Sequence, residues 1–297
     1  MPKRKKSAVK RVIVTPDKHF PLEDKRAIKI VCKAIEIIKP DAYIDLGDTG
    51  EWQHFSTHYW KGRFAKPMED LIPLLEQDIN DVNKGMDQID RSLDKAKCKE
   101  RHFVQGNHEV WLDKFVFRYP YLEKYTTENA LKLEERGYEF HPYNRKKTLK
   151  MGKLNFTHGK FVSKYHSYKH LDVYSENIMY GHTHDLQRHT KTHAGGTISA
   201  WSLGCLKDIE EDEDWLSGRL TNWNHAFAII DFFNNGDFIK SFSFLKNSDS
   251  GKNLSNTPTL SCGSKEIKRL FLVALIASKC LGAIKPATPI NPKFLFI

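Results

Sequence analysis

The sequence predicts a mixed α/β fold. Short runs of β-branched and apolar residues alternate with amphipathic stretches of helical periodicity through most of residues 12–245. The first three of these, at 11–15, 23–39 and 42–46, make a β-α-β unit, in which the two strands run parallel and the connection is right-handed. Further along, residues 234–237 (NNGD) are a hairpin signal between two runs, so antiparallel pairing is expected as well.

The N-terminal half contains the clearest elements. A helix at 23–39 keeps its apolar residues on one broad face until Pro40 ends it. The strand at 42–46 reads AYIDL, which is typical of a buried strand. The predicted elements of this half are strands at 11–15, 42–46 and 102–105, the helix at 23–39, and a long, mostly helical segment with apolar spacing over 71–82.

The C-terminal half is expected to add five strands of more antiparallel character, because of the hairpin signal between the last two. They are predicted at 153–157, 177–180, 197–203, 226–232 and 238–244. From residue 246 the pattern dissolves into Asn, Ser, Asp, Gly, Thr and Pro, which predicts a linker at 246–263. A basic and apolar segment of unassigned role follows at 264–297, so the sequence predicts one domain over 12–245.

The net charge of +10 is concentrated at the two ends of the chain. Residues 1–11 contain six basic and no acidic side chains, and residues 246–297 have a net charge of +6, which leaves −2 for residues 12–245. The basic N-terminal arm, residues 1–11, is a candidate contact for DNA or RNA phosphates. The alternative is that both ends are solvated termini that keep the protein in solution.

Composition also restricts the cellular compartment. The five cysteines lie far apart without a C-x-x-C pair, which argues against a disulfide framework and favours a reducing compartment. The first eleven residues are charged and lack the apolar stretch of a secretory signal. The longest apolar run, at 270–277, has eight residues, whereas a membrane-spanning helix needs roughly 20. These features predict a cytoplasmic protein without a membrane span.

Candidate metal ligands follow the C-terminal ends of five predicted strands. In order along the chain they are Asp17 and His19, then Asp48, then Asn107, then His158, and finally His182 and His184. In open α/β sheets, ligands bind in the crevice beyond the carboxyl ends of the strands, so we expect these side chains to converge.

The chemistry of this set suits a pair of divalent metal ions. Carboxylates and imidazoles together favour Mn, Fe or Zn, and a carboxylate such as Asp48 can bridge two ions about 3.5–4 Å apart. Each motif alone is weak, since a Gly-Asp pair is usually a turn and a lone histidine after a strand is usually a hydrogen-bonded structural residue. The prediction depends on the ordered set.

The ordered motifs D-x-H, G-D, G-N-H-E, H and G-H-x-H resemble those of the calcineurin-like metallophosphoesterase superfamily. The resemblance implies a four-layered α/β/β/α sandwich, in which helices flank two mixed sheets, and a binuclear centre that takes Mn²⁺, with Fe or Zn as alternatives. It implies that Asp17, His19, Asp48 and His184 bind the first ion, and that Asp48, Asn107, His158 and His182 bind the second.

The same resemblance assigns His108 and Glu51 to catalysis. His108 would not be a ligand but would lie beside the scissile phosphate, stabilising its charge or protonating the leaving oxygen. The protein phosphatases of the superfamily carry G-D-x-V-D-R-G, and here Glu51 falls at the second Asp and Trp52 replaces the Arg. Glu51 is therefore a candidate to orient His108, or alternatively only a cap for the following segment, and a protein phosphatase identity is disfavoured.

These features predict a metal-dependent phosphoesterase that hydrolyses phosphoester bonds by attack of a metal-activated hydroxide. A phosphodiesterase or nuclease is favoured, because residues 202–206 (SLGCL) and 223–228 (WNHAFA) are similar to segments of phage and bacterial phosphoesterases related to the SbcD nucleases. The alternatives are a phosphomonoesterase for nucleotides, sugars or proteins, and a non-catalytic metal-binding scaffold, against which the presence of His108 argues.

Three further segments have alternative interpretations. The aromatic and imidazole residues between 52 and 64 could stack nucleic-acid bases, although a small core under a loop is favoured. The basic run at 145–147 suits either a phosphate backbone or a solvated turn. The acidic run at 208–214 would repel a polyanion. His189 and His193 follow the last motif but are expected at the surface or behind the ligands.

Overall fold

The computed structural model describes most of the chain up to residue 245. The described residues are 9–56, 59–61, 66–144, 147–210, 216 and 218–245. All of them belong to the first of two units, Met1–Leu245. Residues 1–8 of the predicted arm, the predicted linker 246–263 and the segment 264–297 lie outside the described residues.

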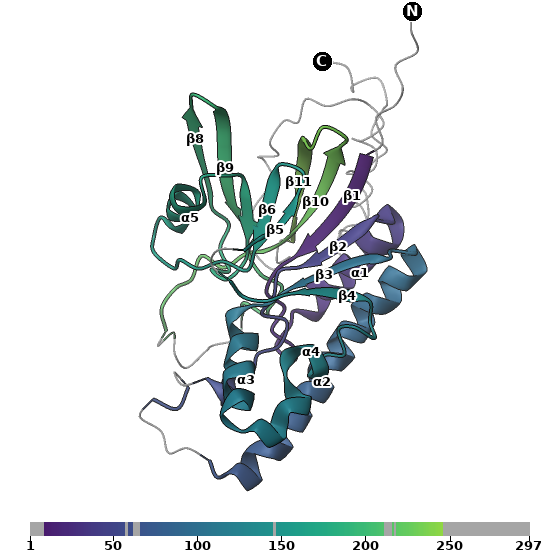
Figure 1. Cartoon of the computed structure of the whole chain (residues 1–297), viewed down its shortest axis with the longest axis vertical. Coiled ribbons are helices and arrows are strands. Elements are labelled where there is room, and N and C mark those ends of the chain that lie inside the picture. Colours follow the sequence, from purple (N-terminus) through teal and green to yellow (C-terminus); the bar gives the residue numbers. More distant parts are fainter. Residues whose placement is uncertain are drawn as a thin grey trace, which may run out of the picture. The chain divides into compact units, whose positions relative to one another are not determined.

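The first sheet has six strands, in the order β11-β10-β1-β2-β3-β4 (Figure 1). The strands are β1 (Val9–Thr15), β2 (Ala42–Asp45), β3 (Glu100–Val104), β4 (Tyr138–His141), β10 (His225–Phe233) and β11 (Phe238–Leu245). From β1 to β4 the strands are parallel, whereas β10 pairs antiparallel with both of its neighbours. Lys10 and Arg11, at the end of the predicted arm, lie in β1 and pair with Glu100 and Asp231, each at 2.6 Å.

The second sheet has five strands, in the order β5-β6-β7-β9-β8. They are β5 (Leu149–Met151), β6 (Leu154–Thr157), β7 (Ile178–Tyr180), β8 (Arg188–His193) and β9 (Gly196–Ser202). The expectation of mainly antiparallel pairing is wrong for the central strands, because β6, β7 and β9 are parallel. A helix connects β6 to β7, and β8 lies between β7 and β9 in the sequence, so each connection is long enough to cross over.

The main core lies between the two sheets. Buried residues of the first sheet, such as Val12, Ile44 and Ile230, form one cluster with residues of the second sheet, such as Phe156 and Trp201. These residues alternate along their strands, which places one face of each sheet in the core. The two sheets therefore pack face to face, and the ends of their strands lie close together.

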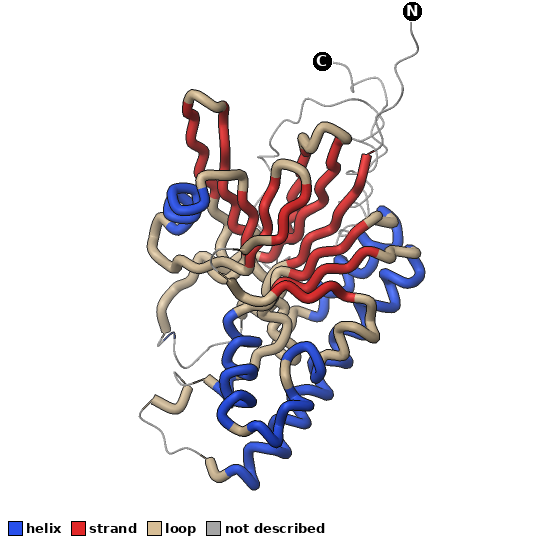
Figure 2. The backbone as a smooth tube through the Cα atoms, in the orientation of Figure 1, coloured by secondary structure: helices blue, strands red, loops and turns tan. Residues whose placement is uncertain are grey.

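Helices cover the outer faces of the sheets (Figures 1 and 2). The α-helices are α1 (Lys25–Ile38), α2 (Met68–Ala96), α3 (Asn107–Arg118), α4 (Thr127–Ala130) and α5 (His166–Tyr174), and the 3₁₀ helices are η1 (Gln53–Phe55) and η2 (Pro120–Tyr125). Asp24 caps α1 by accepting hydrogen bonds from the backbone N–H groups of Arg26 and Ala27. On the second sheet, Leu171 of α5 packs against Ile178 and Ala200. The predicted arrangement of two mixed sheets flanked by helices is confirmed.

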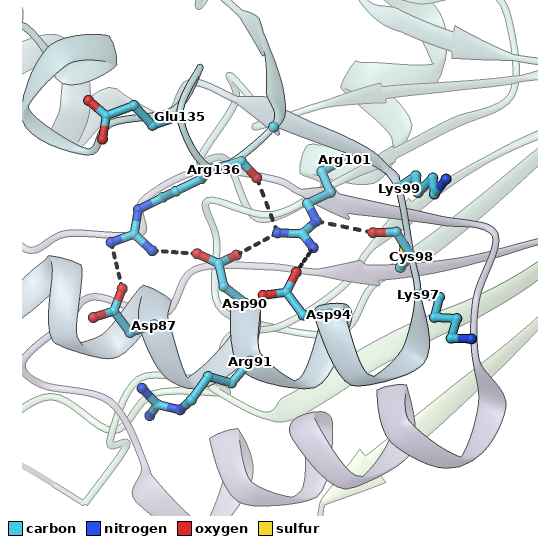
Figure 3. Close-up of a pocket in the computed structure, with 11 residues that line it drawn as sticks. Asp87, Asp90, Arg91, Asp94, Lys97, Cys98, Lys99, Arg101, Glu135 and Arg136 are labelled. Atoms are coloured by element: carbon cyan, nitrogen blue, oxygen red, sulfur yellow. Dashed lines mark hydrogen bonds and ion pairs between the residues drawn. The ribbon is translucent and has the colours of Figure 1, made fainter.

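An ion-pair network ties the C-terminal half of α2 to the chain before β4 (Figure 3). Arg136 pairs with Asp90 and, at 2.7 Å, with Asp87, while Arg101 pairs with Asp94 and, at 3.5 Å, with Asp90. These side chains line a cavity of about 750 Å³. Since the two guanidinium groups are matched by carboxylates, this network is a structural connection between α2 and the sheet.

The strands that sequence periodicity missed are short or polar. β4 and β5 have four and three residues, and β8 (RHTKTH) has no apolar residue at all. Both β4 and β8 lie at sheet edges, where one or both faces remain in solvent and an alternating pattern is not required. None of the helices in the described part of the chain is sufficiently long and apolar to cross a lipid bilayer.

Candidate metal centre

The loops after β1, β2, β3, β6 and β7 meet at one place between the two sheets. Backbone hydrogen bonds connect them, because Lys18 and His19 donate to the carbonyl oxygen of Asp48, at 3.0 and 2.9 Å, and Gly181 donates to that of His158, at 2.8 Å. The side chain of Asp17 accepts the backbone N–H of His182, which joins the two sheets. The structure thus brings together the side chains that the sequence analysis expected to converge.

Asp48 lies at the centre of the group. Its Oδ2 is 3.1 Å from Nε2 of His158 and 3.9 Å from Nε2 of both His19 and His108. The carboxylate is 2% exposed. Burial opposes its ionisation, but the imidazoles of His158 and His108 hold the pKa of Asp48 well below its usual range. A carboxylate with imidazoles on several sides suits a bridging position between two cations.

Asp17, His19 and His184 form one side of the centre. The Nε2 atoms of His19 and His184 are 3.0 Å apart, and Nε2 of His184 is 3.7 Å from Oδ1 of Asp17. Burial raises the pKa of Asp17 well above its usual range, with a further increase from Asp48, although His158 works against both. Nδ1 of His184 is buried without a hydrogen-bond partner among the described residues.

His158, Asn107 and His182 form the other side. Nδ1 of His158 donates to the carbonyl oxygen of Leu46, at 2.8 Å, which directs Nε2 toward Oδ1 of Asn107, at 2.9 Å, and toward Asp48. Such a hydrogen bond to one ring nitrogen fixes the tautomer and leaves the other nitrogen as a ligand. The ring of His182 lies 5.1 Å from that of His158, measured between centroids.

This donor set fits divalent metal ions. Three overlapping groups each bring their ligand atoms within 4.8 Å of one another: Asp17 with His19 and His184, His19 with Asp48 and His108, and Asp48 with His158 and His182. Two buried carboxylates and several imidazoles with inward lone pairs are costly to bury without a cation. The buried aspartate and histidine groups of this centre can therefore hold metal ions, and their chemistry favours borderline ions.

The backbone is strained at four of the candidate ligands. His19, Asp48, His182 and His184 have positive φ angles of 52°, 46°, 72° and 59°. Non-glycine residues rarely adopt this region, and such outliers concentrate at functional sites. The loops also approach too closely for a side chain at Gly106, where a Cβ would collide with Asp48.

Glu109, the fourth residue of the G-N-H-E motif, organises the loop that carries Asp48. It is fully buried in α3, and its carboxylate accepts the backbone N–H groups of Asp48 at 2.9 Å, Thr49 at 2.8 Å and Gly50 at 3.1 Å. It also accepts the N–H of Gly106, at 2.9 Å. The sequence alone assigns Glu109 no role beyond its place in the motif.

A buried ion pair lies behind the same loops. Nζ of Lys18 is 2.7 Å from Oδ1 of Asp45, and both side chains are at most 2% exposed. The same oxygen accepts hydrogen bonds from the N–H of Gly47, at 3.0 Å, and from Oγ1 of Thr49, at 2.9 Å. The pair joins the first two ligand loops. Sequence analysis missed it, although an Asp inside the apolar run AYIDL signals a buried charge that needs a partner.

His108 and Glu51 are in contact through the main chain of Glu51. Nδ1 of His108 donates to the backbone carbonyl oxygen of Glu51, and the N–H of His108 donates to Oδ1 of Asp48, at 2.9 Å. The carboxylate of Glu51 instead lies 2.7 Å from Nδ1 of His19 and 3.0 Å from Nζ of Lys207. Glu51 therefore positions His108 with its main chain and His19 with its side chain.

Aromatic side chains lie against three of the histidines. The ring centroid of Trp111 is 3.9 Å from that of His108, and the ring of Trp223 is 4.7 Å from that of His184. Tyr143 lies 6.1 Å from His158. The sequence does not indicate that Trp111 and Tyr143 lie at the site. They belong to none of its motifs, and only the folded structure brings them next to the histidines.

The other candidate segments have mixed outcomes. Trp52 and Phe55 are buried, and Phe55 packs on Phe115 with ring centroids 4.8 Å apart, which is the core role favoured for this aromatic cluster. His189 and His193 lie on β8, outside the ligand groups of the described residues. Residues 57–58, 62–65, 145–146 and 211–215 of the segments discussed above lie outside the described residues.

Comparison with known proteins shows a distant likeness to solved structures. No family model matches the sequence, and no curated protein matches it. Among solved structures, the chain is similar to Vps29 of Chaetomium thermophilum, with 10% sequence identity and a TM-score of 0.35, over 79% of this chain and 97% of that one. A likeness at this level supports no inference about function, so the interpretation of the metal centre depends on its own residues.

Proposed function

We propose that this chain is a binuclear metal-dependent phosphoesterase of the calcineurin-like kind and that it cleaves phosphodiester bonds of nucleic acid. The observation that carries the proposal is the position of Asp48, whose carboxylate oxygen lies within 3.9 Å of the imidazoles of His19, His108 and His158. Phosphoester hydrolysis needs concentrated positive charge, because negative charge develops on the phosphate oxygens in the transition state. A carboxylate surrounded by imidazoles can hold the cations that supply this charge.

The ligand assignment follows the two sides of the centre. Asp17, His19, Asp48 and His184 would hold one ion, and Asp48, Asn107, His158 and His182 would hold the other. Two bound divalent ions, Mn²⁺ in the first instance, would neutralise phosphate charge and acidify a water for attack on phosphorus. Asn107 adds a neutral oxygen to this set, so it contributes a ligand without adding negative charge.

His108 is the residue we propose as proton donor. Its Nδ1 is fixed by the carbonyl of Glu51, which leaves Nε2 directed toward the group around Asp48. An imidazole in that position can donate a hydrogen bond to the phosphate and a proton to the departing oxygen. The carboxylate of Glu51 has a positioning role, because it holds His19 from the side away from His184.

A basic and aromatic surface next to the centre supports a nucleic-acid substrate. The chain that follows His158 carries three lysines, Lys160, Lys164 and Lys169, and two tyrosines, Tyr165 and Tyr168, which are 66% and 51% exposed. Nζ of Lys160 lies 4.7 Å from the ring of Tyr143, beside His158. Exposed aromatic rings interleaved with lysines bind single strands by stacking on bases and pairing with phosphates.

The hydrolytic proposal is tested with two small esters in the presence of Mn²⁺. We expect faster hydrolysis of bis-p-nitrophenyl phosphate than of p-nitrophenyl phosphate. Asp48→Asn should lose both bound metal, measured by elemental analysis, and hydrolysis, because its carboxylate serves both ions. Asp70→Asn, which changes an exposed carboxylate on α2, is the matched control. Full metal content and activity in Asp48→Asn would overturn the assignment, and a monoester preference would overturn the diesterase part alone.

The substrate class is tested with single-stranded DNA and RNA. The double variant Lys164→Ala and Tyr165→Ala should bind these strands more weakly and reduce the slope of log K against log salt by about 0.7 for the lost phosphate contact. Hydrolysis of the small diester should not change. Lys33→Ala, on α1, removes an equal charge elsewhere. Unchanged strand affinity in the double variant would contradict this surface as the substrate contact.

A further inference from the structure

A second group of metal-ligating side chains lies on neighbouring strands β3 and β4. His102 comes from β3, and Glu139 and His141 come from β4, where Glu139 is directly opposite His102 in the register. None of the three belongs to the candidate metal centre described above, whose ligands follow the strand ends. The three side chains can present one ligand atom each within 4.8 Å of one another.

The distances from His102 to its two neighbours match those of ligands that share one ion. Nδ1 of His102 is 3.0 Å from Nε2 of His141 and 3.3 Å from the carboxylate of Glu139. Nε2 of His141 is 3.7 Å from the same carboxylate. Two ligand atoms bound at about 2.1 Å lie about 3.0 Å apart at a right angle and about 3.4 Å apart at the tetrahedral angle.

A hydrogen bond with Glu100 orients the ring of His102 for metal binding. Oε1 of Glu100 is 3.0 Å from Nε2 of His102 and 2.6 Å from Nζ of Lys10. A carboxylate that accepts one imidazole N–H leaves the lone pair of the other nitrogen facing the site, which is the usual arrangement behind metal-binding histidines.

The three side chains differ in how far they are exposed to solvent. The side chain of His102 is 8% exposed, that of His141 is 21% exposed, and that of Glu139 is 67% exposed. His102, Glu100 and Glu139 line a cavity of about 890 Å³, whose wall includes Leu149 and Met151 of the second sheet. An ion can therefore reach this group from solvent through the exposed side chain of Glu139.

We propose that His102, His141 and Glu139 form a mononuclear site for a divalent transition-metal ion such as Zn²⁺, separate from the candidate metal centre. Two imidazoles with one carboxylate select such ions over Ca²⁺ and Mg²⁺. An ion held by these three side chains would join β3 to the edge strand β4. The site does not depend on the proposed hydrolytic activity.

The test measures zinc per chain in the full-length protein by elemental analysis, after equilibration with Zn²⁺ and removal of unbound metal. His141→Ala should contain one ion fewer than the unmodified protein. The deficit should persist in an Asp48→Asn background, which removes the carboxylate proposed to serve both ions of the candidate metal centre. Glu139→Gln changes an exposed side chain and should weaken zinc binding without unfolding. Glu100→Gln should lower the affinity about 10–100-fold, the usual effect of losing such a partner.

The control is His193→Ala, which removes an exposed histidine from β8. It should leave the zinc content unchanged. The proposal is overturned if His141→Ala and Glu139→Gln both bind as much zinc as the unmodified protein at the same free concentration. It is also overturned if His193→Ala loses zinc to the same extent, because the loss would then reflect surface histidines in general.

Discussion

The buried carboxylate of Glu109 in α3 accepts the backbone N–H of Asp48, at 2.9 Å, in the loop after β2. The same carboxylate holds the N–H groups of Thr49, Gly50 and Gly106. Asp48 has a φ of 46°, a conformation that is unfavourable for a residue with a side chain. The loop therefore needs contacts from elsewhere in the fold to hold this conformation. Glu109 supplies such contacts, and it connects the β2 and β3 loops.

Glu109→Ala is expected to lower the free energy of unfolding by roughly 3–5 kcal/mol, because it leaves four buried N–H groups without an acceptor. Chemical denaturation checks this value. Metal content should fall as well, since Asp48 loses its fixed position. Glu135→Ala, at an exposed carboxylate, is the comparison. If Glu109→Ala were as stable as that control, the carboxylate would not hold the loop.

His108→Ala should retain its metal ions and lose rate by about 10²–10⁴-fold for a poor leaving group, which needs a proton donor. The loss should be smaller for an activated aryl ester. Rate constants for esters of graded leaving-group pKa, with metal content measured in parallel, test both statements. Loss of the metals, or equal losses across the ester series, would show that His108 is not the proton donor.

Arg136→Ala should lower the free energy of unfolding by about 2–4 kcal/mol, because Asp90 then remains largely buried with less compensation (Figure 3). Arg91→Ala changes an exposed arginine on α2, the helix that contains Asp90, and should have little effect. Urea denaturation of both variants gives the comparison. Equal stability of the two variants would mean that the network does not stabilise the attachment of α2.

The stability of the protein should depend on pH through His170. Its Nδ1 donates to the carbonyl oxygen of His166, at 2.8 Å, and its Nε2 accepts the N–H of Lys160, at 2.9 Å, so the folded protein requires the neutral ring. Burial lowers the pKa of His170 from 6.5 to about 4. Between these values the unfolded chain binds the proton and the folded protein does not, so stability falls on acidification.

His170→Gln removes this contribution. Between pH 7.5 and pH 5 the free energy of unfolding should fall about 2 kcal/mol less in the variant than in the unmodified protein. Denaturation at the two pH values measures the difference. His193→Gln, at an exposed position, should retain the full pH dependence. An identical pH dependence in His170→Gln would exclude this histidine as a cause.

Deletion of residues 1–8 tests the basic arm. The deletion removes Lys3, Arg4, Lys5 and Lys6 but keeps Lys10 and Arg11, which belong to β1. If the arm contacts duplex DNA, affinity should fall and the slope of log K against log salt should decrease by about 0.9 for each lost phosphate contact. Hydrolysis of a small diester should not change. An unaltered salt slope would leave the arm as a solvated terminus.

The sequence by itself determined the mixed α/β class and most strands, because apolar runs of β-branched residues and the NNGD turn depend on local chemistry. The strand at 42–46 and the helix at 23–39 correspond to β2 and α1, with boundaries shifted by one or two residues. The ordered polar motifs also predicted which side chains would converge, because the carboxyl ends of parallel strands lie at one edge.

Tertiary structure alone decided the supporting contacts. No local pattern predicts that the carboxylate of Glu51 would face His19, or that Trp111 would lie on His108, because these relations depend on how distant loops pack. The parallel pairing of β6, β7 and β9 was likewise decided by crossover connections. His102 and His141 lie 39 residues apart, and only the register of β3 with β4 brings their ring nitrogens to 3.0 Å.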